Sequence, residues 1–131
     1  MSGGLRIRVL PEPDGRLPAR MEGKFLQLRL DGQEWLVFAP RARHRYHNQI
    51  LAELLGERGT PYVWEDGRTV LGFHDPGVEV IGGGRFAADT EAGTLLLWDD
   101  SRAYGRFDER GLAGRIAAAG HPWSRFAVTI R

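Results

Sequence analysis

KFLQLRLDGQEWLVFAP, the stretch from Lys24 to Pro40, carries the strongest fold signal in the chain. Two β-rich runs flank the pair Asp31-Gly32. Such a pair between two runs is typical of a β-hairpin, because the turn needs positive φ and glycine supplies it. We therefore predict paired strands over Lys24–Leu30 and Glu34–Ala39, with proline ending the second strand.

Further strands are predicted on both sides of this hairpin. Upstream, LRIRVL (Leu5–Leu10) alternates apolar and basic residues as a half-buried strand does, and Pro11–Pro18 is a predicted loop. Downstream, Asp66-Gly67 predicts a second hairpin. The other predicted strands are Tyr62–Glu65, Arg68–Leu71, Val78–Ile81, the continuous apolar run Thr94–Trp98 (TLLLW), expected centrally in the sheet, and Phe126–Ile130.

Two helices are predicted between the strands. From about Arg43 to Arg58, apolar residues recur at helical spacing, and the run stops at Gly59. A second helix has Asp108 as its predicted N-cap, includes Leu112–Ala119 and stops at Gly120. Strands interleaved with two helices predict an α/β (α+β) fold, with a mixed sheet of about six strands flanked by the helices.

The composition is that of a folded domain. Of 131 residues, 42% are hydrophobic and 27% charged, so we expect one domain over residues 1–131. The absence of cysteine excludes a disulfide framework, a thiolate metal site and a cysteine nucleophile. No leader pattern and no apolar run of about 20 residues is visible, so we expect a cytoplasmic protein with no membrane partner.

His47 is the first candidate for chemistry. On a helical wheel it falls within the apolar arc that contains Ile50 and Leu54, so its side chain is expected to face the sheet. A neutral imidazole near a helix start can accept a proton at physiological pH. The alternative is a core-edge histidine bonded to a backbone carbonyl. His44, three residues earlier, lacks a carboxylate or cysteine at ligand spacing, so no metal site is predicted.

Three other segments could bind an anion. Gly82-Gly83-Gly84-Arg85 follows a strand, and consecutive glycines let backbone N–H groups converge, although a turn or bulge is the alternative. Ser101 follows the TLLLW strand, where α/β folds place ligands, while Asp99-Asp100 are interpreted as turn residues. The basic run from Arg41 to Arg45 is either a solvated helix start or faces phosphate, because cations disfavour a helix N-terminus.

The order of these segments resembles the Janus/Ocnus family of protein-histidine phosphatases (phosphohistidine phosphatases). The resemblance lies in Tyr46-His47 at a helix start, a strand into Gly-Gly-Gly-Arg, and a strand into Ser-Arg-Ala-Tyr-Gly at Ser101–Gly105. It continues through the second helix and the last strand, and so covers most of the chain. Family members are small one-domain proteins with a mixed sheet flanked by two helices, which agrees with the fold predicted above.

The resemblance implies a specific chemistry. His47 would be the proton acceptor that directs water at the phosphorus of phosphohistidine, without a metal or other cofactor. The residues that would bind substrate or phosphate are Lys24, Arg85, Ser101, Arg102 and Ala103. The family's arginine ahead of the helix could correspond to Arg41 or Arg43. Thr60–Gly77 is longer than expected and adds a hairpin that could cover the site or change the preferred substrate.

The leading hypothesis is therefore a metal-independent phosphatase acting on phosphohistidine or a related phosphoramidate. Its partners would be a phosphohistidine-bearing protein or a small phosphoramidate, together with phosphate ion, and we expect a monomer. The main alternative is a non-catalytic module that binds a phosphate-bearing partner in the same cleft. Nucleic-acid binding through Arg41–Arg45 ranks last, because the formal net charge is only +1 and the positive charge is local.

Overall fold

The computed structural model describes residues 4–10, 17–66 and 70–131 of the chain. Two sequence predictions therefore lie wholly or partly outside the described residues. These are most of the loop predicted at Pro11–Pro18, and the turn at Gly67 with the beginning of the strand predicted from Arg68.

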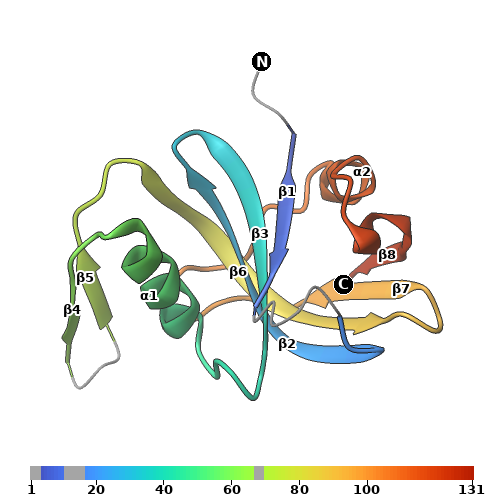
Figure 1. Cartoon of the computed structure of the whole chain (residues 1–131), viewed down its shortest axis with the longest axis horizontal. Coiled ribbons are helices and arrows are strands. Elements are labelled where there is room, and N and C mark those ends of the chain that lie inside the picture. Colours follow the sequence, from blue (N-terminus) through green and yellow to red (C-terminus); the bar gives the residue numbers. More distant parts are fainter. Residues whose placement is uncertain (1–3, 11–16, 67–69) are drawn as a thin grey trace.

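Six strands form one mixed sheet in the order β1-β3-β2-β6-β7-β8 (Figure 1). The predicted hairpin supplies its antiparallel β2–β3 pair; β6 and β7 extend the sheet antiparallel, and β1 and β8 add parallel edges. The bounds are β1 (Arg6–Val9), β2 (Arg20–Leu30), β3 (Gln33–Pro40), β6 (Val78–Asp89), β7 (Thr94–Trp98) and β8 (Ala127–Ile130). The prediction of a mixed sheet of about six strands is confirmed, and TLLLW has neighbours on both sides.

The helices lie on opposite faces of this sheet (Figure 1). The second predicted hairpin is present, but its strands β4 (Tyr62–Glu65) and β5 (Val70–Phe73) form a separate two-stranded sheet next to the first helix. The helices are α1 (His47–Arg58), α2 (Leu112–Ala117) and a 3-10 turn, η1 (Pro122–Arg125). Within the described ranges, every helix is too short or too polar to cross a membrane.

Alternation along the strands gives each face of the sheet its own core. Phe25, Phe38 and Phe86 lie on one face, where α2 and η1 close over them and Trp123 packs edge-on against Phe38 at 5.1 Å between ring centroids. On the other face, α1 buries its apolar side against β2 and β3. That second core contains Leu26, Leu28, Val37, Ala39, Ile50, Leu51, Leu54 and Leu55.

The helix starts differ from the sequence prediction. α1 begins at His47 and not near Arg43, because the N–H groups of Arg43 and His44 both donate to the carbonyl of Pro40 and close turns there. The N-cap assigned to Asp108 is wrong. Its carboxylate binds Arg110, and α2 begins after a glycine at φ +65°, a left-handed conformation that glycine adopts without strain.

The glycine run also differs from the prediction of a strand that stops at Ile81. β6 continues through Gly82, Gly83 and Gly84 to Asp89. The reason is that other parts of the chain lie very close to these glycines. A Cβ added at Gly83 would lie 2.7 Å from Cδ2 of His47, and one at Gly82 would lie 2.3 Å from the carbonyl oxygen of Arg106. The glycines therefore let a side chain and a neighbouring segment lie against the strand, and they do not form an anion-binding loop.

Candidate anion-binding cleft

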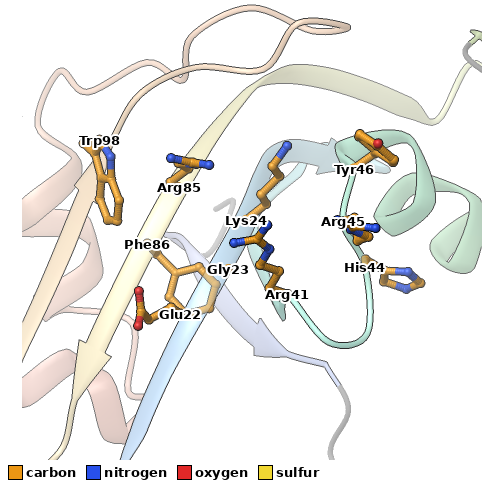
Figure 2. Close-up of a pocket in the computed structure, with 10 residues that line it drawn as sticks. All are labelled: Glu22, Gly23, Lys24, Arg41, His44, Arg45, Tyr46, Arg85, Phe86 and Trp98. Atoms are coloured by element: carbon orange, nitrogen blue, oxygen red, sulfur yellow. The ribbon is translucent and has the colours of Figure 1, made fainter.

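A cleft of about 300 Å³ lies on the α1 face of the sheet, beside the N-terminus of that helix (Figure 2). Its floor is made by β2, β6 and β7, and one wall by the loop between β3 and α1. Four cationic side chains and one carboxylate are among the lining residues. These residues are Glu22, Gly23, Lys24, Arg41, His44, Arg45, Tyr46, Arg85, Phe86 and Trp98.

Strand register places Lys24 directly opposite Arg85, and Arg85 directly opposite Trp98. The three side chains therefore form one row across the sheet, and Figure 2 shows Arg85 between the other two. Like charges at directly opposed positions destabilise a strand pair. Partial burial lowers the pKa of Lys24, and the charge of Arg85 lowers it further. Asp99 offsets part of this repulsion, with Oδ2 3.7 Å from Nε of Arg85. An anion bound between the two cations would relieve the rest.

The basic residues ahead of α1 make two different kinds of contact. Nε of Arg43 and Nε2 of His44 both bind Oε1 of Glu53 on α1, at 2.9 and 2.8 Å, and these contacts fold the loop onto the helix. Arg41 and Arg45 line the cleft, as does the ring of His44, whereas Arg43 does not. Of the two arginines that could replace the family's pre-helix arginine, Arg41 is thus the one at the cleft.

His47 lies against the β6 backbone, between the lining residue Tyr46 and the glycines that precede Arg85. Its side chain faces the sheet as predicted, the residue is only 4% exposed, and Nε2 lies 3.0 Å from the carbonyl oxygen of Gly84. Gly84 precedes Arg85, so the imidazole is next to the row of cations, although His47 itself is not among the lining residues. This contact is also the one expected of a core-edge histidine.

The hydrogen bond fixes which nitrogen of His47 carries the proton. A carbonyl oxygen can only accept, so Nε2 donates and Nδ1 keeps its lone pair in the neutral ring. Burial lowers the pKa of His47, and the positive charge of Lys24 acts in the same direction. Among the described residues, Nδ1 has no hydrogen-bond partner. In that part of the chain, the only side-chain polar atom that is both fully buried and without a partner is Nε1 of Trp123, so Nδ1 is not fully buried. Nδ1 therefore keeps some contact with solvent.

Polar groups of the Ser101–Gly105 segment form hydrogen bonds within the segment. Backbone hydrogen bonds join Ser101 and Gly105 in both directions, and the Ser101 hydroxyl accepts from the N–H of Tyr104 at 3.1 Å. Ser101 is buried, whereas Arg102 and Ala103 are exposed, and none of the three lines the cleft. Only Arg102 has an electrostatic link to it, since its charge contributes to the lowered pKa of Lys24.

Tyr46 and Trp98 are cleft residues that sequence reasoning gave no role. The ammonium of Lys24 lies 5.4 Å from the centroid of the Tyr46 ring, a cation–π contact that holds the lysine at the cleft mouth. Trp98 closes the far end of the row. A signal existed for Trp98, since it ends the TLLLW strand, but only the strand register shows that it stands opposite Arg85.

No group of three metal-ligating side chains occurs in the part of the chain that the structure describes. None of the described residues of the β4–β5 hairpin lines the cleft either, so its role as a cover stays a prediction. A comparison of the sequence with protein-family models and with curated proteins finds no match. The residues of the site are therefore the basis for a function.

Proposed function

We propose that this chain is a metal-independent phosphatase that hydrolyses phosphohistidine or a related phosphoramidate, with a Janus/Ocnus-like fold and a cytoplasmic location. The observation that carries the proposal is the His47 imidazole, whose pKa is lowered by burial. It has one tautomer, an Nδ1 lone pair in contact with solvent, and a position beside the opposed pair Lys24 and Arg85. A base next to an anion-binding pair is what attack of water on a phosphoryl group requires.

In the proposed reaction, the phosphoryl oxygens bind between Lys24 and Arg85, which offset their negative charge. Nδ1 of His47 takes a proton from water as the water oxygen bonds to phosphorus. The P–N bond breaks, and the departing imidazole or amine takes a proton from solvent. The P–N bond is labile once its nitrogen is protonated, so positioning and charge neutralisation are the main contributions required of the protein.

The second candidate is a non-catalytic module that binds a phosphate-bearing partner in the same cleft. The burial of His47 and of Ser101 favours it, because both make hydrogen bonds within the fold and neither lines the cleft. Lys24 and Arg85 would bind the phosphate in either case.

The deciding experiment measures phosphate release from chemically phosphorylated poly-histidine and from phosphoramidate, with a chelator present. We expect release by the wild type and a loss of about 100-fold or more in His47→Ala, as for removal of a general base. His47→Gln keeps an N–H donor for the Gly84 carbonyl but no base, and should lose activity while remaining folded. His74→Ala, at an exposed histidine outside the cleft, is the matched control.

Release by His47→Gln at the wild-type rate would refute the mechanism, and a wild type that binds phosphate without turnover would establish the binding module.

A further inference from the structure

Cationic side chains line the cleft from two sides. Lys24 and Arg85 stand in one row of the sheet, and an anion of the size of a phosphoryl group can contact both. Arg41 and Arg45 come from the loop after β3, on the opposite side of β2 from β6 (Figure 2). The proposed reaction does not require Arg41 or Arg45, since a small phosphoramidate carries no second anionic group for them to bind.

Arg41 and Arg45 line the cleft together with one carboxylate, that of Glu22, and form no ion pair with it. The N–H of Arg41 donates to the carbonyl of Glu22, and a Cβ at Gly23 would lie 2.9 Å from that nitrogen, so the backbone of this loop is pressed onto β2. Among the residues that the structure describes, neither arginine forms an ion pair, whereas Arg43 between them pairs with Glu53. Guanidinium groups without partners at a concave surface favour a carboxylate or phosphate ligand.

Two carboxylates stand beyond the Trp98 end of the cleft, although neither of them lines it. Asp99 and Asp100 follow Trp98 directly and are exposed, and Asp99 adopts φ +70°, which turns the chain away from β7. A long polyanion such as a nucleic acid, crossing the whole cleft, would meet these carboxylates. A short segment with its negative charge at the Arg41 and Arg45 side would avoid these two carboxylates, although it would share the cleft with Glu22.

We infer that Arg41 and Arg45 form a second anionic subsite, which binds an acidic side chain close to the phosphohistidine of a protein substrate. The inference depends on the proposed function for the identity of the first anion. It assigns the substrate class as an acidic segment of a protein and not a free phosphoramidate. It also gives the segment a direction, with acidic residues on the side of α1 and neutral or basic residues on the side of Asp99.

The test measures binding, so that it does not depend on turnover. Two fluorescent peptides carry a stable triazole phosphonate in place of phosphohistidine, flanked within three residues by Glu in one and by Gln in the other. Fluorescence anisotropy gives the Kd of each for the wild type, for Arg41→Gln/Arg45→Gln and for Arg43→Gln. Arg43→Gln removes charge from the same run but not from the cleft lining, and melting curves check that each variant is folded.

We expect the wild type to bind the Glu peptide about fivefold more tightly than the Gln peptide at low salt, as two exposed ion pairs allow. The double variant should lose this preference and keep its affinity for the Gln peptide, and Arg43→Gln should retain the preference. Equal binding of both peptides by the wild type would overturn the inference, as would an equal loss in Arg43→Gln. Tighter binding of a single-stranded oligonucleotide than of either peptide would also overturn it, in favour of nucleic acid.

Failure of the proposed function has a separate signature. If the phosphate-release assay shows no turnover but the Glu preference is found, the acidic subsite stands and belongs to a binding module. If turnover is found without the preference, the phosphatase stands and the subsite does not.

Discussion

The two faces of the sheet are built from alternating residues of the same strands, yet they are covered to different extents. On one face, α2 and η1 cover an aromatic cluster around Phe38, Phe86 and Trp123. On the other, α1 packs over β2 and β3, while Arg85 and Trp98 farther along the sheet remain at least partly exposed. Completing the core on one face gives the strands their stability, and incomplete cover on the other leaves room for a ligand.

The largest expected difference is in stability. Phe38 is fully buried, so Phe38→Ala should lower the free energy of unfolding by about 3–5 kcal/mol. Trp98→Ala, on the open half of the other face, should lower it by about 1 kcal/mol or less. Urea denaturation measures both, and Phe38→Leu gives a smaller loss in the same direction if the alanine variant does not fold. Equal losses at the two positions would mean that the open half is covered in solution, for example by a second copy of the chain.

A smaller effect is expected where α1 meets the glycine run. In Gly83→Ala, the new Cβ would lie 2.7 Å from the His47 ring and 2.8 Å from the backbone oxygen of Phe25, a clash worth about 1–3 kcal/mol. It should also displace the imidazole and lower any phosphatase activity. Gly56→Ala, in α1 and facing open space, should instead stabilise the protein by about 0.5–1 kcal/mol. Urea midpoints of the two variants, moving in opposite directions, would establish that Gly83 is required for packing, whereas a neutral Gly83→Ala would remove that explanation.

Much of the fold follows from local sequence signals. The Asp31-Gly32 hairpin, the TLLLW strand and the apolar arc of α1, with His47 facing the sheet, could all be predicted because each depends on neighbours within a few residues. Asp99, interpreted as a turn and surface residue, is exposed and has φ +70° directly after β7. The N-cap at Asp108 was wrong, since an ion pair with Arg110 and a left-handed Gly111 compete with capping there.

The site was less predictable because it depends on register and on contacts distant in sequence. Consecutive glycines satisfy a loop pattern, but whether Gly82–Gly84 leave the sheet depends on His47 and Arg106, which approach from elsewhere in the chain. Likewise, no local signal separates Arg41, which lines the cleft, from Arg43, because only the position of Glu53 on α1 distinguishes them.

The smallest expected effect is a pH dependence of stability at the junction of the covered and open regions. Burial lowers the pKa of His47 in the folded protein below its unfolded value of about 6.5. As pH falls through about 6.5, the unfolded chain takes up a proton that the folded protein does not, so stability is lost between that pH and the lower folded pKa. Above 6.5 both states are neutral, and His47 contributes no pH dependence. His47→Gln should therefore lose less stability than the wild type between pH 8 and pH 5 in urea titrations.

The carboxylates of Asp75 and Asp108, whose pKa values ion pairing and hydrogen bonds hold at about 2, do not change charge in this window and are present in both proteins. Parallel curves for the two proteins would mean that burial does not lower the pKa of His47, and that the imidazole is protonated as readily in the folded protein as in the unfolded chain.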